Sequence, residues 1–358
     1  MKKVCILSAV NIRHMSLISL YTEILQKNGV EFDIIYMDKY GEDEEFPAKR
    51  KYVYKNIISQ KSPKWYKVLK YFKFRRYATR ILNRNNYDFV IVWNDVAIFM
   101  FADYLVRKYR NKYCLNIRDY CHQRVKWIYR RFEKVIKSSL FTTISSEGYK
   151  SFLPPYDYCI IHSLNPILFD SLRPRTNLRK DNEPIRIGFV GYVRFFETNK
   201  TLLRLFQNDS RFELHYYGTK ANILKEYAEV NHINNAVFHD TFPVKDTAIY
   251  LDKIDVINNL YGNESIALTT ALSIKLYHGV YAKIPILVCP NTYMEEIVNK
   301  YKLGFVFSEM SNNYKEEFYH WYKHLDFHVF SANCVKFLNT VFEQNKKFEN
   351  KVYEIIRK

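Results

Sequence analysis

The stretches that decide the fold class are KKVCILSAV at residues 2–10 and EFDIIYMD at residues 31–38. The first is a short apolar run that ends in small residues. Residues 15–26, which follow it, carry apolar side chains at helical spacing, and Asn28-Gly29 forms a turn before the second run. A strand, a helix and a second strand in this order form the β-α-β unit of a parallel sheet covered by helices.

The same alternation continues along the chain. Strands are expected at residues 87–94 and 112–119, with helices at 96–109 and 123–138. The polar, proline-bracketed stretch DSLRPRTNLRKDNEP at 170–184 interrupts the pattern, which then restarts. We therefore expect an α/β protein with a Rossmann-like domain at 1–170, a linker at 171–184, a second Rossmann-like domain at 185–335 and a C-terminal helix at 336–358.

The formal charge of +18 lies entirely in the first half of the chain. Residues 1–180 hold 34 basic and 16 acidic residues, whereas residues 181–358 hold 21 of each. Residues 49–84 contain 13 basic residues and no acidic one, and we expect a basic helical region there. A basic amphipathic helix with aromatic residues suits an anionic membrane surface. The candidate membrane-contacting residues are Lys64, Trp65, Lys67, Lys70, Lys73, Arg75 and Arg76.

Two other interpretations of this basic region remain open. Basic and aromatic residues also bind nucleic acid, but we find no RNA-recognition, KH, zinc-finger or helix-turn-helix signature. The region could also be a solvated helix face. The six cysteines are scattered without a CxxC pair, and the best apolar run, 88–106, is interrupted by aspartates. We expect a cytoplasmic protein with reduced thiols.

The second half contains two basic residues placed where a diphosphate could bind. A strand is expected to end at Gly191, with Arg194 in the loop beyond it, and an arginine there can clamp a diphosphate. In the segment 263–290, Ser273-x-Lys275 begins a helix whose first N–H groups are free to bind an anion. The alternative is a strand–helix turn with a surface arginine, followed by an ordinary helix with one surface lysine.

The segment 263–290 resembles the donor-binding helix of GT-B glycosyltransferases, particularly the group 1 family of bacterial capsular and surface polysaccharide synthesis. The segments 188–197, 211–218, 116–122 and 144–154 look like further elements of that family in the expected order. The resemblance implies two Rossmann-like domains facing a central cleft, with the C-terminal helix crossing back to the first domain. It assigns the acceptor to the first domain and the nucleotide-sugar donor to the second. The matching residues of the donor helix are Ser273, Lys275, Leu276, Tyr277, Pro285, Ile286 and Leu287.

One position departs from the family pattern. The family has an acidic residue three positions after the lysine, where this chain has His278, and a second acidic position eight residues earlier, which here is Thr270. Glu264 could supply the missing carboxylate. The expected donor-binding residues are therefore Gly191, Arg194, Gly218, Glu264, Ser273, Lys275 and His278.

Two residues of the first domain are candidates for a catalytic base. His14 follows the first strand and Asp119 follows a later one, and a base at such a strand edge could deprotonate an acceptor hydroxyl. His122 is a weaker candidate. The chain has no Asp-x-Asp triplet, so we expect no metal and no cofactor, with Arg194, Lys275 and backbone N–H groups stabilising the departing diphosphate.

The function expected from these residues and from the resemblance is sugar transfer. A nucleotide-diphosphate sugar, on family frequency UDP-linked, would donate to a hydroxyl of a lipid-linked oligosaccharide of the undecaprenyl-diphosphate type, in capsule or exopolysaccharide repeat-unit assembly. The enzyme would be bacterial and bound peripherally to the anionic inner face of the cell membrane, with no nucleic-acid partner. The alternatives are a non-catalytic basic protein that binds membranes or nucleic acid, and an epimerase of the same two-domain fold. The oligomeric state stays open.

Overall fold

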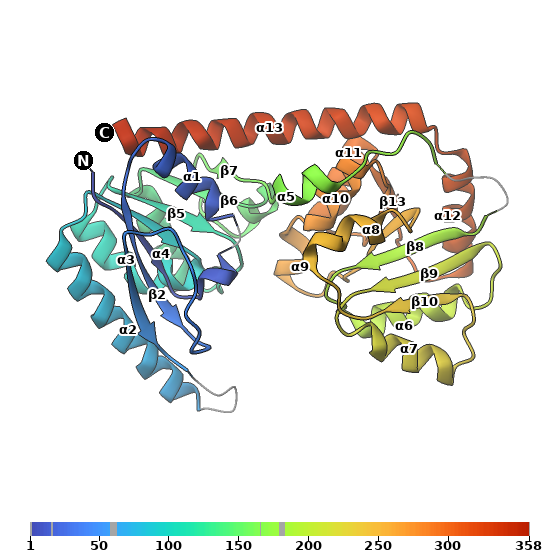
Figure 1. The fold of residues 1–358 in the computed structure, drawn as a ribbon, viewed down its shortest axis with the longest axis horizontal. Helices are drawn as coiled ribbons and strands as arrows, with labels where there is room; N and C mark the ends of the chain where they lie inside the picture. The colour runs from blue at the N-terminus through green and yellow to red at the C-terminus, as the bar shows by residue number, and fades with distance from the viewer. Residues whose placement is uncertain (1, 16, 58–62, 165, 179–182, 358) are drawn as a thin grey trace. The chain divides into compact units, whose positions relative to one another are not determined.

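The chain folds into two α/β units in the computed structural model, which describes residues 2–15, 17–57, 63–164, 166–178 and 183–357. Unit 1 comprises residues 1–163 together with 343–358, and unit 2 comprises residues 164–342. In Figure 1 the chain is coloured from blue at its N-terminus to red at its C-terminus.

Unit 1 is built on a parallel sheet. Its described residues form seven strands in the order β3-β2-β1-β4-β5-β6-β7, and Val4 of the interior strand β1 pairs with Phe32 on one side and Phe89 on the other. The strands are β1 (Val4–Ser8), β2 (Phe32–Asp38), β3 (Arg50–Lys55), β4 (Phe89–Trp93), β5 (Tyr113–Ile117), β6 (Phe141–Ile144) and β7 (Cys159–Ile160).

Helices cover this sheet and complete its core. The C-terminal helix α13 contributes Phe348, Val352 and Ile355, which are buried with the β1 and β2 side chains. Phe348 meets Tyr21 of α1 edge to face, with ring centroids 4.8 Å apart. The expectation that the C-terminal helix packs on the first domain is therefore confirmed. The helices of unit 1 are η1 (Ile12–His14), α1 (Ser19–Lys27), α2 (Lys64–Asn85), α3 (Asp95–Lys108), α4 (Lys126–Lys137), η2 (Glu147–Ser151) and the end of α13 (Phe327–Arg357).

The strand β3 was not predicted. Its sequence RKYVYK lies in the basic stretch that we expected to be helical, yet it pairs in parallel with β2, with Asp33 opposite Arg50. Its middle residues Tyr52 to Tyr54 are half-buried and its basic ends are exposed, which suits an edge strand, and its lysines discourage pairing with another chain. The basic helix begins only at Lys64.

Unit 2 repeats the architecture. Its described residues form six parallel strands in the order β10-β9-β8-β11-β12-β13. The strands are β8 (Ile185–Val190), β9 (Phe212–Tyr217), β10 (Ala236–His239), β11 (Val256–Asn259), β12 (Ile286–Val288) and β13 (Gly304–Val306). The helices are α5 (Pro166–Ser171), α6 (Phe196–Leu205), α7 (Ala221–Val230), η3 (Val244–Asp246), α8 (Thr247–Leu251), α9 (Ile266–Thr270), α10 (Ile274–Ala282), α11 (Tyr293–Tyr301), α12 (Asn312–His324) and the start of α13.

The chain passes between the units earlier than we expected. Phe169 and Leu172 are buried in the core of unit 2, and the Arg175 backbone N–H donates to the Ala282 carbonyl at 3.1 Å. The first part of the predicted linker therefore belongs to unit 2, and part of the remainder, residues 179–182, lies outside the described residues. The final helix begins at Phe327, before the expected residue 336, because its first turns pack in unit 2 through Phe330 and Phe337.

Candidate functional site

Two glycines bring the ends of strands β8 and β9 of unit 2 into contact. Gly191 has φ +119°, and its N–H donates to the Tyr217 carbonyl at 2.8 Å. Gly218 has φ +133°, and a Cβ there would lie 2.0 Å from the Gly191 carbonyl oxygen. Only glycine fits this position without moving the backbone. The two glycines that we expected at the site therefore shape one corner of the carboxyl-terminal edge of the sheet.

Helix α10 presents a buried lysine at the same edge. The Ser273 hydroxyl caps the helix by accepting the Lys275 N–H at 3.3 Å. Lys275 is only 6% exposed, and its Nζ lies 2.9 Å from the ring centroid of Phe189 and 5.3 Å from that of Tyr261. Within the described part of the chain, this Nζ has no hydrogen-bond partner. Burial, with the charge of Arg194, holds the pKa of Lys275 well below its usual value.

Arg194 stands close to this lysine but is exposed. It follows Gly191 in the loop beyond β8, and its guanidinium carbon lies 5.9 Å from the Tyr192 ring centroid. Burial raises the pKa of Tyr261 to about 12, against the effects of the Ser273 hydroxyl and the Arg194 charge. One guanidinium thus acts electrostatically on both Lys275 and Tyr261. Arg194 therefore places a positive charge beside the buried amine of Lys275 at this edge.

His278 lies one helical turn beyond Lys275 and is also buried. Its Nε2 has no hydrogen-bond partner among the described residues. Burial, and then the Lys275 charge, lower the pKa of His278 to about 4. The imidazole is therefore neutral at pH 7 and offers one donor and one acceptor. It can bind a hydroxyl, but it does not supply the negative charge of a carboxylate.

The substitute carboxylate that we expected, Glu264, lies in the loop before α9. Glu264 is exposed and folds over Gly262, where a Cβ would come within 2.3 Å of the glutamate Oε2. No hydrogen bond or ion pair joins Glu264 to another described residue. Thr270, at the second departed position, donates its hydroxyl to the Ile266 carbonyl at 2.6 Å.

A small cavity of about 80 Å³ adjoins the N-terminus of α10. Ser273, Tyr261 and Asn259 line it, together with residues of α9 and the N-terminus of α11. The Asn259 Oδ1 is buried and, within the described residues, has no hydrogen-bond partner. Asn259, Tyr261 and Phe189 were not predicted from the sequence. The available signal was the polar pair Asn258-Asn259 at the end of an otherwise apolar strand, since polar residues there face the ligand edge.

In unit 1, two carboxyl groups meet at the corresponding edge of the sheet. Asp95, the first residue of α3, accepts the backbone N–H groups of Asp119 at 3.0 Å and Arg118 at 3.2 Å through its Oδ2. Its Oδ1 is buried and has no hydrogen-bond partner among the described residues. Burial, and then the charge of Asp119, raise the pKa of Asp95 to about 7.

Asp119 is the more accessible of the two. Burial raises its pKa, and the Arg118 charge opposes the effect. Its carboxylate makes no hydrogen bond to another described residue, so it is available to a ligand. Sequence reasoning identified Asp119 but missed Asp95, although Asn94-Asp95 directly follows a buried strand.

His14, the second candidate base, has a different environment. It ends η1 and is exposed, and its Nε2 lies 2.9 Å from the Tyr40 hydroxyl. Within the described part of unit 1, no hydrogen bond joins His14 to Asp119. His122, the weaker candidate, sits in the loop after β5 with φ +56°.

The expected membrane-contacting residues lie on α2. Trp65 is 69% exposed, and Lys70, Lys73 and Arg76 are exposed or half-buried. Arg75 instead turns inward, and its Nε donates to the Met100 carbonyl at 2.9 Å. The side chains of Lys64 and Lys67 lie outside what the structure describes.

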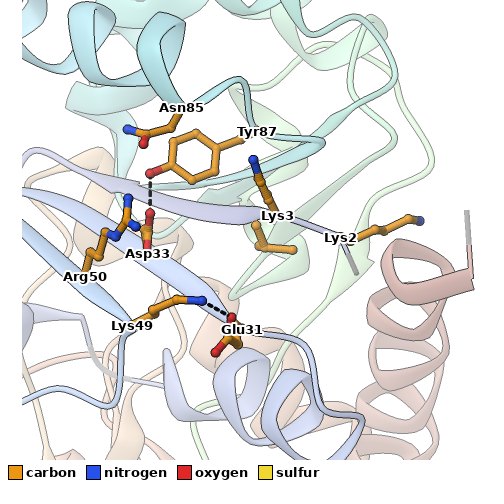
Figure 2. A pocket seen from close by; sticks show the side chains of 9 residues that line it. Lys2, Lys3, Glu31, Asp33, Lys49, Arg50, Asn85 and Tyr87 are labelled. Atoms are coloured by element: carbon orange, nitrogen blue, oxygen red, sulfur yellow. Dashed lines mark hydrogen bonds and ion pairs between the residues drawn. The ribbon is translucent and has the colours of Figure 1, made fainter.

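Unit 1 has a cavity of about 240 Å³ at the opposite edge of its sheet, where β1 to β4 begin. Figure 2 shows two interactions in its lining: Lys49 pairs with Glu31, and the Tyr87 hydroxyl donates to Asp33 at 2.6 Å. Ligands of parallel α/β sheets bind at the carboxyl-terminal edge, so we do not place the site here.

The described residues offer neither a membrane span nor a metal centre. Over these residues, no helix is both long and apolar enough to cross a membrane. The same residues contain no group of three or more His, Cys, Asp or Glu side chains that could hold a metal ion.

The chain is similar in structure to known proteins over its whole length. No protein-family model and no curated protein matches the sequence. Sucrose-phosphate synthase from Thermosynechococcus elongatus matches with a TM-score of 0.71 and 10% identity over 100% of both chains. The HepE protein of Anabaena, solved in complex with UDP, matches with a TM-score of 0.66 and 9% identity over 99% of this chain and 100% of its own. A putative UDP-N-acetylglucosamine 2-epimerase from Listeria monocytogenes matches with a TM-score of 0.53 and 10% identity over 96% of this chain and 97% of its own.

These similarities establish the fold. Two parallel Rossmann-like sheets with a C-terminal helix contacting the first unit form the GT-B architecture, as the sequence predicted. Because a synthase and a putative epimerase share this fold, the fold alone does not define the activity.

Proposed function

We propose that this chain is a glycosyltransferase that takes its sugar from a nucleotide-diphosphate donor bound by unit 2. The observation that carries the proposal is Lys275, a buried amine without a hydrogen-bond acceptor among the described residues, at the carboxyl-terminal edge of the sheet. A buried polar group without a partner in a native protein calls for an explanation, and a bound ligand is one. An anionic ligand would supply the acceptor and restore the charge of the amine.

A diphosphate fits this position. Lys275 and the exposed Arg194 provide two cations, and the first turn of α10 provides backbone N–H groups at the positive end of the helix. Gly191 and Gly218 have no side chains that would keep a phosphate away from the strand ends. As the sugar leaves, these groups would stabilise the negative charge that develops on the diphosphate.

The remaining expected donor contacts are part of the same proposal. His278 would bind a hydroxyl of the donor as a neutral group, and Ser273 would hold the start of α10 in place. Glu264, which lies over Gly262 of the cavity lining, would supply a carboxylate to the donor. A uridine nucleotide is the donor we propose, supported by the bound UDP named for the structurally similar HepE protein.

For the acceptor we propose Asp119 as the base that removes the hydroxyl proton. It combines an accessible carboxylate with a pKa raised above the ordinary value, which makes it a stronger base. Asp95 would position it by holding its backbone N–H. His14 remains the other candidate, with its imidazole steadied by Tyr40.

We further propose a lipid-linked acceptor of the undecaprenyl-diphosphate type, in assembly of a capsule or exopolysaccharide repeat unit. The support is the charge of the first half of the chain and the basic helix α2, whose 22 residues include no acidic one. Such a helix would hold the protein on the cytoplasmic face of an anionic membrane. The reaction as proposed uses no metal ion, and transfer should persist in EDTA.

The test is a thermal-shift screen with UDP-, GDP-, CMP- and dTDP-linked sugars, followed by assays of sugar transfer and donor hydrolysis. We expect one nucleotide class to raise the melting temperature of the wild type but not of Lys275→Met. The matched control is Lys300→Met, which removes an exposed lysine of α11. Stabilisation by none of the donors, or equal stabilisation of Lys275→Met, would contradict the proposal. Loss of transfer and donor hydrolysis in Lys275→Met, with vesicle binding kept, would distinguish a catalyst from a non-catalytic membrane-binding protein.

A further inference from the structure

An apolar groove lies on unit 1 between α2 and α3. Its volume is about 450 Å³, and it extends to Arg131 of α4. In Figure 1, α2 is the light-blue helix at the outside of unit 1. We call this feature the α2 groove, and its apolar walls are formed by Val68, Tyr71 and Phe72 of α2 and Val96, Phe99 and Met100 of α3.

The rim of the α2 groove exposes large apolar side chains. Phe72 is 59% exposed and Val68 is 67% exposed. On the α4 side, Trp127 is 61% exposed and packs edge to face on Phe99, with ring centroids 5.5 Å apart. A contiguous apolar patch of this kind on a protein surface marks an interaction site.

Two arginines hold the walls together. The Arg75 Nε donates to the Met100 carbonyl at 2.9 Å and ties α2 to α3. The Arg131 Nε donates to the Phe99 carbonyl at 2.8 Å and its guanidinium pairs with Asp103 at 2.5 Å, which ties α4 to α3. The side chains of both arginines are therefore engaged in hydrogen bonds between the helices of unit 1. They give the groove a preformed shape, and Arg131 neutralises Asp103, the carboxylate of its lining.

The surface around the groove is cationic. Lys73, Arg76 and Arg80 are exposed or half-buried on α2, a helix without acidic residues. An apolar channel beside this positive charge complements a molecule with an anionic head and a hydrocarbon tail. A nucleic acid would match the charge but would leave the apolar channel without a partner.

We propose that the α2 groove receives an acyl chain of an anionic phospholipid bilayer. The charges of α2 attract the headgroups, and the space between α2 and α3 takes up hydrocarbon. This inference rests on the proposed membrane docking and adds the place and the chemistry of insertion. It predicts two separable components of binding, one that salt weakens and one that salt does not.

The experiment measures flotation of the full-length protein with phosphatidylglycerol and phosphatidylcholine vesicles at 0.1 M and 0.5 M NaCl. We expect the wild type to prefer phosphatidylglycerol and to retain measurable binding at 0.5 M NaCl. Met100→Gln places a polar group of similar size in the wall and should reduce the high-salt partition coefficient by about tenfold. Its matched control, Val230→Gln, alters an equally apolar but exposed position of unit 2 and should have no effect.

Two further variants separate charge from insertion. Lys73→Glu with Arg76→Glu should abolish the preference for phosphatidylglycerol, while Lys225→Glu, an exposed lysine of unit 2, should not. Phe72→Ser removes an exposed apolar side chain and so tests insertion without disturbing the core, should Met100→Gln fold poorly.

The outcomes distinguish this inference from the proposed function. Vesicle binding that Met100→Gln and Phe72→Ser leave unchanged would overturn the groove as the insertion site while membrane docking stands. Absence of vesicle binding by a wild type that still binds a nucleotide sugar would overturn both membrane proposals and leave the donor site intact. Tight binding of a single-stranded oligonucleotide that displaces the vesicles would also overturn the inference.

Discussion

Replacing Asp95 by asparagine should stabilise unit 1, and the gain should depend on pH. An unfolded chain ionises this carboxyl near the ordinary pKa of 3.8, whereas the folded protein does so only near pH 7. Between these values the folded state holds a proton that the unfolded state has released. The free energy of unfolding therefore falls as pH rises from about 4 to about 7, and the loss is complete above pH 7.

The size of the effect follows from the shift. One pKa unit corresponds to about 1.4 kcal/mol, so the burial of an ionised Asp95 costs at most about 4 kcal/mol. The asparagine side chain cannot ionise, yet its oxygen can still accept the N–H groups of Arg118 and Asp119. We expect Asp95→Asn to match the wild type near pH 4 and to exceed it increasingly up to about pH 7.

The measurement is a series of urea unfolding curves from pH 4.5 to 8.5, with hydrogen exchange of the β4 and β5 amides reporting on unit 1 alone. Asp157→Asn, which neutralises a carboxylate nearer the surface of the same unit, serves as the control. A stability difference that is the same at every pH, or an Asp95→Asn protein less stable than the wild type at pH 8, would refute the reasoning.

Three further predictions concern the candidate sites. Lys275→Met should raise the stability of the ligand-free protein at pH 7, since it removes a buried amine held below its usual pKa, and should abolish stabilisation by UDP in calorimetry. His278→Asn should keep donor affinity within a few-fold because it preserves a neutral hydrogen-bonding group, whereas His278→Leu should lose about tenfold; titration calorimetry of the two variants checks this. Asp119→Asn should lower kcat for transfer by at least about a hundredfold and remove the acidic limb of its pH profile, while His14→Ala should change kcat less; the reverse order would identify His14 as the base.

The fold followed from the sequence wherever a strand was buried on both faces. β1, β4 and β5 are short continuous apolar runs, so their positions were predicted to within a few residues. β3 was missed because its half-buried tyrosines and exposed basic ends are typical of an edge strand and lie in a stretch dominated by positive charge. The boundary between the units lies earlier in the chain than predicted because the polar residues 173–178 pack on unit 2. The Arg175 guanidinium donates there to the carbonyls of Leu251 and Asp252.

The candidate site was predictable only in part. Arg194 and Lys275 were identified because a basic residue after a strand end or at the start of a helix is well placed to bind a phosphate. We did not predict the contact of the Phe189 ring with Lys275 or that of the Asp95 carboxyl with Asp119. Each contact joins residues more than 20 positions apart in the sequence. Burial of this kind depends on tertiary packing, which residue spacing does not encode.

The path of α13 has a consequence for biosynthesis. The core of unit 1 is completed by Phe348, Val352 and Ile355 of α13, whereas the rest of this unit ends at Ser163. Unit 1 therefore lacks part of its core until the last turns of α13 have emerged from the ribosome. The carboxyl-terminal lobe, residues 164–342, is contiguous and can close first. Unit 1 is thus synthesised first but completes its core last. A fragment ending at residue 163 would expose the apolar surface on which α13 packs.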